Sequence, residues 1–444
     1  MKDIIQVVEK NRQLILDAER YIWKNPETGF KEFKTSKYMA EQFIALGYDL
    51  TYADNITGFY TVLDTEKEGP NVLVLGELDS IICHNHPDSD PETGAVHSCG
   101  HNAQCAALLG VAAALKEKSI IDKLCGKITL CAVPAEELLE IEFRSRLKEK
   151  GIIKYFGGKA EFLYRGYFDD VDLAFMVHTS VGDEFYTRSG AIGCVAKNII
   201  YKGKSAHAGG SPWDGKNALY AATLGINACN AIRERFKEND VIRFHPIITN
   251  GGAIVNAIPE STVLESYVRG KTFEAITSAN KQINQALCGA ALSIGANVEI
   301  IDTPGYAPLS NSKEMINISE QAFKSVYPDQ TFKKHDIYWS ASTDMGDLSC
   351  VMPVVHPYAP GAVGTAHGDD YYIKDKEKAC IMSAVWQLSL LTLLLENGGE
   401  KAKEVIANYT PVFNSKEEYF AYCDSISHAG DRIKYSIDKI EVEV

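Results

Sequence analysis

The chain has 444 residues, with a hydrophobic content of 45% and a charged content of 23%, which are the proportions of an ordinary globular protein. Its formal net charge of -14 at pH 7 argues against nucleic acid or an anionic membrane surface as a partner. The length exceeds what one hydrophobic core usually organises, so it predicts two domains.

The cysteines and the first residues bear on the cellular compartment. The 11 cysteines are an odd number and lie scattered through apolar runs, which is typical of reduced thiols and not of a disulfide framework. Charged residues interrupt the N-terminus from Lys2 onward, unlike the layout of a signal peptide. The longest apolar run, 383–395, is too short to span a bilayer. We therefore expect a cytoplasmic protein without a membrane partner.

Apolar residues at helical spacing predict one amphipathic helix over residues 2–24, which ends at Asn25-Pro26. Four short apolar runs come later, and acidic or imidazole side chains close each of them. Such unbroken runs suit strands covered on both faces, as in a mostly parallel α/β sheet with helices on each side. The runs and their closing residues are 71–75 with Asp79, 127–133 with Glu136 and Glu137, 173–177 with His178, and 353–355 with His356.

The closing residues matter because ligands of α/β sheets bind beyond the carboxyl ends of the strands. Polar residues must follow any strand, which is the plainer explanation of this pattern. The particular types found here, Asp, paired Glu and His, are compatible with metal binding. We therefore expect a metal site at this edge of the sheet.

Cys99 and His101 stand one glycine apart, directly before a predicted helix over 103–116. Gly100 allows the backbone to fold tightly between the two side chains. The positive end of the helix favours the thiolate of Cys99, which is the form that binds metal. By itself, this pair fits a buried cysteine and a capping histidine equally well.

The pattern changes near Gly190. The predicted order from there is strand, helix, two strands, helix and strand, which is the βαββαβ order of a ferredoxin-like unit. We therefore expect a main domain formed by residues 1–189 and 306–444, with an inserted α+β domain at 190–305 and more helix from Lys401. The predicted elements of the insertion are 191–201, 217–236, 241–249, 262–268, 272–292 and 297–302.

The chain offers sulfur, nitrogen and oxygen donors in a combination that suits Zn²⁺, Mn²⁺ or Co²⁺. Five candidates exceed the ligands of one site, so they indicate two ions, with Cys99 or Glu137 shared. Glu136 is adjacent to Glu137, so one carboxylate can bind metal while the other moves protons beside a metal-activated water. The five candidate ligands are Cys99, His101, Glu137, His178 and His367.

Several separate stretches resemble the aminoacylase and carboxypeptidase-like co-catalytic metallopeptidases. The chain is most similar to their N-acyl-amino-acid amidohydrolase branch, which includes aminobenzoyl-glutamate and auxin-conjugate hydrolases. The resemblance runs from Asn25 to about Leu395, and the joint order of its stretches is specific. These are Gly-Glu-Leu-Asp at 76–79, His-Ser-Cys-Gly-His-Asn at 97–102, Pro-Ala-Glu-Glu at 134–137, Met-Val-His at 176–178, Gly-Lys-Ser-Ala-His-Ala at 203–208, Val-Asn-Ala-Ile-Pro at 255–259 and Ser-Thr-Asp-Met-Gly-Asp at 342–347.

The resemblance implies roles for individual residues. The five candidate ligands match the family's metal ligands, and Glu136 matches its general base. In the inserted domain, His207 matches a histidine that reaches over a dimer partner's site and steadies the oxyanion. Asn256 and Arg269 fall where the family's lid grips the substrate carboxylate. From the residues alone, His207 also fits a surface loop, and Arg269 fits a solvated charge at a strand end.

Other residues near these stretches are less distinctive. Asp79 either caps the turn after its strand or orients a metal ligand, and Glu77 stands where relatives outside this branch carry a ligand histidine. The loop with Cys83, His84 and His86 is longer than in many relatives, and a loop at the rim of the site explains it better than a further metal site. His97 is expected to be structural.

The resemblance therefore implies a homodimeric, metal-dependent amidohydrolase with two zinc or manganese ions per subunit and a lid that closes over the site. Its expected substrate is a small N-acyl amino acid or an aminobenzoyl-glutamate-like conjugate, cleaved by metal-activated water with Glu136 as general base. A dipeptidase on the same scaffold is the nearest alternative. A non-catalytic protein that binds metal or a small ligand is the other, although such a protein has no need of a proton relay at Glu136.

Overall fold

The structure is a computed structural model that describes residues 2–436 and 439–444. The chain forms two compact units. The first unit contains the residues up to Gly190 together with Leu309–Trp339 and Thr343–Lys416. The second unit contains Ala191–Pro308, Ser340–Ser342 and Glu417–Val444.

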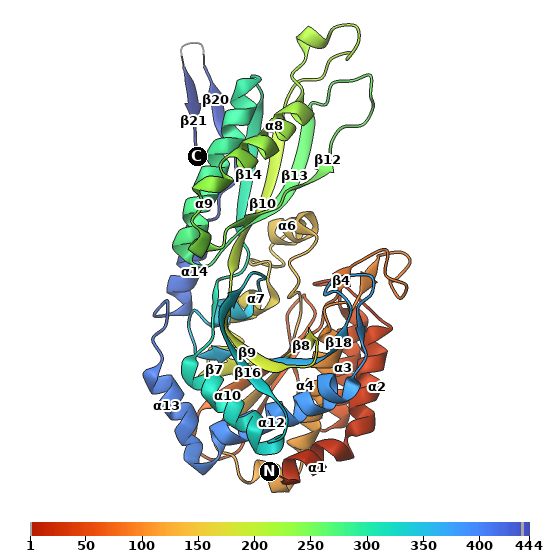
Figure 1. The fold of residues 1–444 in the computed structure, drawn as a ribbon, viewed down its shortest axis with the longest axis vertical. Coiled ribbons are helices and arrows are strands. Elements are labelled where there is room, and N and C mark those ends of the chain that lie inside the picture. The colour runs from red at the N-terminus through yellow and green to blue at the C-terminus, as the bar shows by residue number, and fades with distance from the viewer. Residues whose placement is uncertain (1, 437–438) are drawn as a thin grey trace. The chain divides into compact units, whose positions relative to one another are not determined.

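A six-stranded sheet forms the centre of the first unit (Figure 1). Its strands are, in spatial order, β1 (Thr51–Tyr52), β2 (Phe59–Asp64), β6 (Lys127–Val133), β3 (Asn71–Glu77), β7 (Leu173–Phe175) and β17 (Val354–Val355). From β6 to β17 the neighbouring strands run parallel, whereas β2 is antiparallel to β6. The four apolar runs of the sequence are these four parallel strands, which confirms the predicted fold class.

The position of β3 in this sheet determines where the site lies. All seven residues of β3 are buried, so both of its faces are covered. Helix α4 (His101–Ala114) packs against it, and every residue of this helix is buried as well. Gly76 pairs with Ala132 and Glu77 with Val133, so β3 and β6 end side by side. The turns that follow these two strands therefore lie at the same edge of the sheet.

The N-terminal region differs from its prediction in one respect. Two helices, α1 (Lys2–Lys10) and α2 (Arg12–Trp23), replace the single helix expected over 2–24. The break falls at Asn11, whose backbone leaves the helical region and whose side-chain amide donates to the Val7 carbonyl oxygen at 3.0 Å. Asparagine favours such local hydrogen bonds over helix continuation, and apolar spacing alone does not reveal it.

Helix α12 (Ser383–Leu395) continues a preceding π-helical turn, Glu377–Met382. Together they form a segment of 19 residues that is long and apolar enough to cross a membrane, which is longer than the run recognised in the sequence. However, 89% of its most apolar stretch is buried inside the protein. It packs against α4 and α10 (Lys313–Val326), so it is a core helix of the first unit.

The first unit has a second sheet that the sequence does not predict. It contains β8 (His178–Val181), β9 (Phe185–Ala191), β15 (Leu309–Ser310), β16 (Phe332–Trp339), β18 (Tyr358–Val363) and β19 (Tyr372–Ile373). Strands β8 and β18 run parallel, and Tyr358 pairs with His178. This pairing fixes the backbone of His178, the first residue of β8.

The remaining elements of the first unit are short helices and one small hairpin. They are α3 (Phe33–Ala45), α5 (Lys118–Ile121), α6 (Ile141–Glu149), α7 (Gly158–Tyr164), α11 (Met345–Leu348), α13 (Glu400–Asn408), β4 (Ile81–Ile82) and β5 (Ala95–Val96).

The second unit has the strand and helix order expected of the insertion. Its elements are β10 (Gly193–Lys202), α8 (Ala218–Ala231), β11 (Arg243–Phe244), β12 (Ile247–Asn250), β13 (Ser261–Gly270), α9 (Phe273–Ser293) and β14 (Asn297–Pro304). The sheet order is β11-β13-β10-β14, with β12 also paired to β13 and every pair antiparallel. Buried and partly exposed residues alternate along β13, because one face of the sheet packs on the core. Figure 1 shows α8 and α9 together on one face of this sheet.

The C-terminal stretch belongs to the second unit, although the sequence assigned all of 306–444 to the main domain. It contains α14 (Lys416–Ser425), β20 (Ile433–Tyr435) and β21 (Ile440–Val442), so the tail is not all helix as expected. The tail is held along β14: the Ile300 amide donates to the Gly430 carbonyl at 3.2 Å, and the Arg432 amide donates to the Val298 carbonyl at 2.9 Å. The unpaired edge of β14 provides these partners, and local sequence patterns do not report such an edge.

A buried ion pair stabilises the second unit and makes its stability depend on pH. Lys197 donates to Asp302, and both side chains are fully buried. Burial would raise the pKa of Asp302, but the charge and hydrogen bond of Lys197, with the amides of Asn280 and Asn284, lower it below its usual value. This contribution to stability is therefore present above the unfolded pKa of about 4 and is lost as the pH falls through the folded pKa.

We expect Lys197→Met to destabilise the second unit by about 3–5 kcal/mol at pH 7, because it leaves the buried Asp302 carboxylate with its amide hydrogen bonds but without its ion-pair partner. In the variant the pKa of Asp302 rises, so the loss should shrink when Asp302 is protonated near pH 4. Urea unfolding at both pH values measures this difference. Lys202→Met is the matched control, because Lys202 pairs with Glu299 and Asp431 near the surface and should cost about 1 kcal/mol or less. Equal losses for Lys197→Met at both pH values would contradict the assignment.

Candidate metal centre

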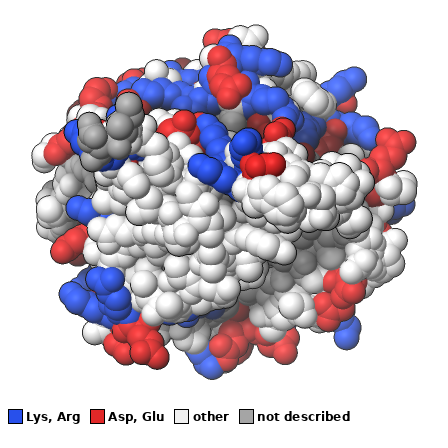
Figure 2. Space-filling model, turned by 90° about the horizontal axis from the view of Figure 1, so that it is seen from above, with Lys and Arg blue, Asp and Glu red and all other residues white. Residues whose placement is uncertain are grey.

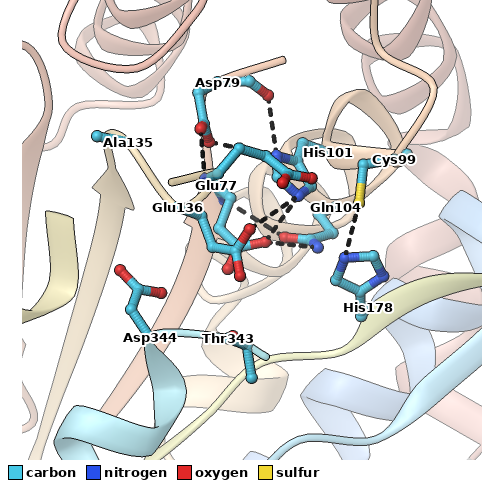
Figure 3. Close-up of polar contacts among 12 residues, drawn as sticks. Glu77, Asp79, Cys99, His101, Gln104, Ala135, Glu136, His178, Thr343 and Asp344 are labelled. Atoms are coloured by element: carbon cyan, nitrogen blue, oxygen red, sulfur yellow. Dashed lines mark hydrogen bonds and ion pairs between the residues drawn. The ribbon is translucent and has the colours of Figure 1, made fainter. Parts of the chain in front are cut away.

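The predicted site residues of the first unit meet beyond the carboxyl ends of β3 and β6. They come from five separate parts of the chain: the turn after β3, the start of α4, the turn after β6, the start of β8 and, for His367, the loop between β18 and β19. Figure 3 shows the side chains of Asp79, His101 and Glu136 turned toward one another, with Cys99 next to His178. The strand ends therefore bring these residues together, as the sequence predicts.

Gly100 separates the two candidate ligands at the start of α4. It is the N-cap of the helix and has a φ of 91°, a left-handed conformation that favours glycine. A Cβ atom here would lie 2.5 Å from Oη of Tyr371 and 2.9 Å from Cβ of Thr179. Only glycine fits this position, and it allows both Cys99 and His101 to face the same site.

Cys99 belongs to two groups of candidate donor atoms. Cys99, His101 and His178 form the first group, and Cys99, Glu137 and His367 form the second. Within each group the donor atoms all lie within 4.8 Å of one another. Sulfur, nitrogen and carboxylate oxygen donors in this combination suit zinc and similar divalent ions. The five predicted ligands are therefore placed so that they could hold two ions, with Cys99 between them.

The hydrogen bonds of the histidines support this arrangement. Nδ1 of His101 lies 2.9 Å from the Asp79 carbonyl oxygen, and Nδ1 of His178 lies 2.6 Å from the Thr179 carbonyl oxygen. A carbonyl oxygen only accepts, so each Nδ1 donates a proton, and an ion that displaces the proton of Nε2 would take up the lone pair of that nitrogen. Nε2 of His178 lies 3.6 Å from Sγ of Cys99, on the side where an ion would be bound.

Asp79 orients two of the candidate ligands. Its Oδ2 accepts a hydrogen bond of 2.8 Å from the backbone amide of Glu137, and its Oδ1 lies 3.3 Å from Nδ1 of His101. The side chain is fully buried. Contacts of this kind fix ligand geometry in metal sites, so the position of Asp79 suits an orienting role better than that of a simple turn cap.

The charges of the donors favour metal binding. Burial and Glu137 raise the pKa of the Cys99 thiol, but His101, His178 and His367 outweigh them and lower it to about 6. Burial likewise raises the pKa of Glu137, and the imidazole of His367, 3.0 Å away, lowers it to about 2. At neutral pH the thiol and the carboxyl group are therefore in the deprotonated forms that bind metal.

Glu136 has the opposite protonation behaviour to its neighbour. It is 6% exposed, and its Oε2 lies 3.8 Å from Nε2 of His101. Burial, together with the charges of Glu77 and Glu137, raises its pKa well above the usual value. The preceding residue, Ala135, has a φ of 57°, and its amide donates to the buried Glu32 at 2.8 Å, which fixes the turn. A carboxyl group held here with a raised pKa is suited to accepting and returning a proton.

The structure also contains a buried ion-pair network that the sequence does not predict. Lys159, on α7, lies 2.5 Å from Glu77 and also donates to Asp344. All three side chains are fully buried, and Gln104 donates to the other oxygen of Glu77 at 2.9 Å. The sequence indicates only two members of this network: Glu77 and Asp344 fall within stretches that resemble the family. No sequence pattern singles out Lys159.

Glu77 has a position from which it could also contact an ion. Its carboxylate forms a third group of candidate donors with His101 and Glu136. However, both of its oxygens already accept from Lys159 and Gln104, so we assign it to the supporting network.

Two further histidines near the centre are buried. Burial is the main cause that lowers the pKa of His97 and of His356 to about 3, so both rings are neutral. The His356 ring lies nearly parallel to that of His178, with centroids 5.6 Å apart. His356 thus supports a candidate ligand by packing, and His97 fits the structural role expected of it.

The loop between Asp79 and Cys99 is organised by its own contacts. Nδ1 of His86 accepts from the Asp88 amide at 3.0 Å, and its Nε2 lies 2.9 Å from the Tyr371 carbonyl oxygen. Trp23 and Tyr372 pack on the same ring. Both nitrogens of His86 are therefore engaged, and a further metal site at this histidine is not supported.

The three remaining predicted residues lie in the second unit. The Ala208 amide donates to the Asn256 carbonyl at 2.9 Å, so the segments of His207 and Asn256 are neighbours. The exposed His207 ring accepts from the amides of the two glycines that follow, at 3.1 and 2.9 Å. Arg269 donates to Ser342 at 3.2 Å. The roles suggested for these three residues stay predictions.

The fold and the centre, compared with known proteins, define the class: this is a metal-dependent hydrolase that acts on amide or peptide bonds. The chain belongs to peptidase family M20/M25/M40, whose profile matches residues 76–391. This confirms the resemblance recognised in the sequence.

Three relatives are hydrolases named for different substrates. The chain is 28% identical to an Xaa-Arg dipeptidase of Mus musculus, covering 76% of this chain and 74% of that protein. It is 26% identical to an indole-3-acetyl-aspartic acid hydrolase of Enterobacter agglomerans, covering 62% and 70%. It is 27% identical to one component of the p-aminobenzoyl-glutamate hydrolase of Escherichia coli, covering 67% and 59%.

Solved structures share the fold. An aminobenzoyl-glutamate utilization protein of Klebsiella pneumoniae aligns with a TM-score of 0.66 and 20% identity, covering 88% of this chain and 99% of that one. A dinuclear metal-binding M20 peptidase of Bacillus subtilis aligns with a TM-score of 0.62 and 17% identity, covering 87% and 99%.

Proposed function

We propose that the protein cleaves the amide bond of an N-acyl amino acid or of an aminobenzoyl-glutamate-like conjugate. The observation that carries this proposal is Glu136, a buried carboxyl group with a raised pKa beside five candidate metal donors. A protein that only binds metal has no need of such a group. The relatives that hydrolyse indole-3-acetyl-aspartic acid and p-aminobenzoyl-glutamate give the substrate class.

In this proposal Cys99, His101 and His178 would hold one divalent ion, and Cys99, Glu137 and His367 would hold the other, with zinc or manganese as the metal. Bound ions of this kind lower the pKa of water and polarise a carbonyl oxygen. Glu136 takes the proton of the attacking water and returns it to the leaving amine. Asp79 keeps His101 and Glu137 in position throughout.

The second unit would contribute a dimer interface and the substrate contacts. His207 would steady the oxyanion in the partner's site, and Asn256 and Arg269 would hold the substrate carboxylate, which suits the planar fork of an arginine. In Figure 2, an area without charged side chains lies below the centre of the view, and charged side chains surround it. The second unit exposes several large apolar residues, as expected of an interface. They are Trp213, Tyr220, Leu224, Ile247, Ile248, Ile254 and Val255.

We also propose a cytoplasmic location, because all eleven cysteines are free thiols. Light scattering tests the dimer. A monomer that is fully active would contradict the role of His207.

A dipeptidase is the second candidate, since two of the relatives are Xaa-Arg dipeptidases. One experiment separates the candidates: release of free amino acid from a panel of N-acyl amino acids, aminobenzoyl-glutamate, indole-acetyl-aspartate and Xaa-Arg dipeptides. Zinc- or manganese-loaded protein is compared with chelator-treated protein. Metal-dependent release from the acylated substrates supports the proposal, and release from dipeptides alone favours the dipeptidase. No release from any substrate, with metal bound, would contradict both.

A further inference from the structure

The second unit contains a buried cation with no carboxylate partner among the residues that the structure describes. Arg432 is 6% exposed, and its Nε is buried without a hydrogen-bond partner. A single long contact of 3.4 Å joins one terminal nitrogen to the Ile300 carbonyl oxygen. An unpaired buried charge is costly, so a buried guanidinium whose Nε has no hydrogen-bond partner needs an explanation.

The nearby charged residues do not neutralise Arg432. Lys197 is surrounded by acceptors, with Asn280 at 2.9 Å, Asn284 at 2.6 Å and Asp302 as its ion-pair partner. The other oxygen of Asp302 accepts from the same two amides, at 2.8 and 3.2 Å. The carboxylate is therefore fully used by Lys197 and its neighbours. This leaves one positive charge in excess in the buried region.

A cavity of about 380 Å³ opens beside Arg432 in the second unit. Its lining combines side chains that can donate to an anion, among them Arg432, Lys281, His428 and Thr277. Glu443 also lines it, but that side chain is exposed and forms no ion pair with Arg432 in the described structure. The cavity is large enough for a small molecule and has an uncompensated cation at its wall.

We propose that this cavity binds a small oxyanion, with the guanidinium of Arg432 as its principal contact. The chemical class is an anion with two or more oxygens on one centre, either a phosphate or a carboxylate, because both match the planar fork of arginine. The site uses residues of α9, the chain just after α14 and the residue before β20. Its ligand would therefore fasten the C-terminal stretch to the core of the second unit, independently of the hydrolytic reaction.

Isothermal titration calorimetry on the metal-loaded, full-length protein tests the proposal with inorganic phosphate and, separately, with succinate. Arg432→Met should weaken binding by about tenfold or more, because it removes charge-assisted hydrogen bonds. Arg243→Met is the matched control, since Arg243 is an exposed arginine of the same unit, and it should bind as the wild type does. Phosphate binding alone assigns a phosphate ligand, and succinate binding alone assigns a carboxylate.

Three results would overturn the proposal: no binding of either anion, binding that Arg432→Met leaves unchanged, or binding that Cys99→Ala abolishes, which would place the anion at the metal centre. Thermal unfolding without added anion provides a check on folding. Arg432→Met should melt no lower than the wild type, because it removes an unpaired buried charge. If this variant does not fold, Arg432→Gln, which keeps hydrogen-bonding capacity, is measured in its place with the same expected loss of binding.

Discussion

Glu136→Gln is expected to lower kcat by about 10²–10⁴-fold while both metal positions stay filled, because the amide keeps the shape of the side chain but cannot take a proton. Glu136 lies outside the two groups that share Cys99, and it is a buried carboxyl group whose pKa lies well above the usual value. Steady-state kinetics on the best substrate, together with metal analysis by mass spectrometry, measures the two quantities in the same preparation.

The control for this variant is Glu149→Gln, which makes the same chemical change at an exposed position on α6. It should leave kcat unchanged. A Glu136→Gln protein that retains wild-type kcat would show that another group moves the proton. A variant that loses both activity and metal would instead show that Glu136 is itself a ligand, as its closeness to His101 and Glu77 also permits.

Cys99→Ala has the second large expected effect, because Cys99 is common to both donor groups. We expect the metal content to fall from about two ions to less than about one ion per subunit, with activity lost. His178→Ala removes a member of one group only, so it should lose one ion and keep the other. The comparison of these two variants tests whether the thiolate is shared.

Cys83→Ala is the matched control, since Cys83 lies in the loop before the centre and belongs to neither donor group. Its metal content and activity should equal those of the wild type. If Cys99→Ala loses only one ion, the two groups do not share the thiolate. If Cys83→Ala loses metal, the loop takes part in binding after all.

The sequence predicts those parts of the fold whose signals are local. The runs that became β3 and β6 are mostly apolar, and a strand covered on both faces favours this composition. The sequence patterns did not predict the break at Asn11 or the pairing of the tail with β14, and the reasons differ. The first depends on one side-chain hydrogen bond, and the second depends on an open sheet edge far away in the chain.

In the candidate site too, the features that depend on adjacent residues can be predicted from the sequence, and those that depend on distant residues cannot. Cys99, Gly100 and His101 are adjacent, and the turn after β6 places two carboxylates together, so both features are visible in a few residues. The role of Lys159 cannot be seen in a short stretch of sequence, because its partners Glu77 and Asp344 are 82 and 185 residues away in the chain. A lone lysine in a helix is most often a solvated charge, and only the folded structure shows that this one is buried.

The two strands at which the chain leaves and re-enters the first unit are neighbours in one sheet. Strand β9 ends at Ala191, β15 begins at Leu309, and the Asn311 amide donates to the Ser189 carbonyl at 3.0 Å. The inserted segment therefore leaves and returns at adjacent strands, but Ser340–Ser342 and the chain from Glu417 onward also belong to the second unit. A turn in place of residues 192–307 would keep all five candidate donors, but it would also remove β14, along which the C-terminal stretch is held. The inserted segment could therefore change in size while the five candidate donors stay in place, provided that the tail from Glu417 changes with it.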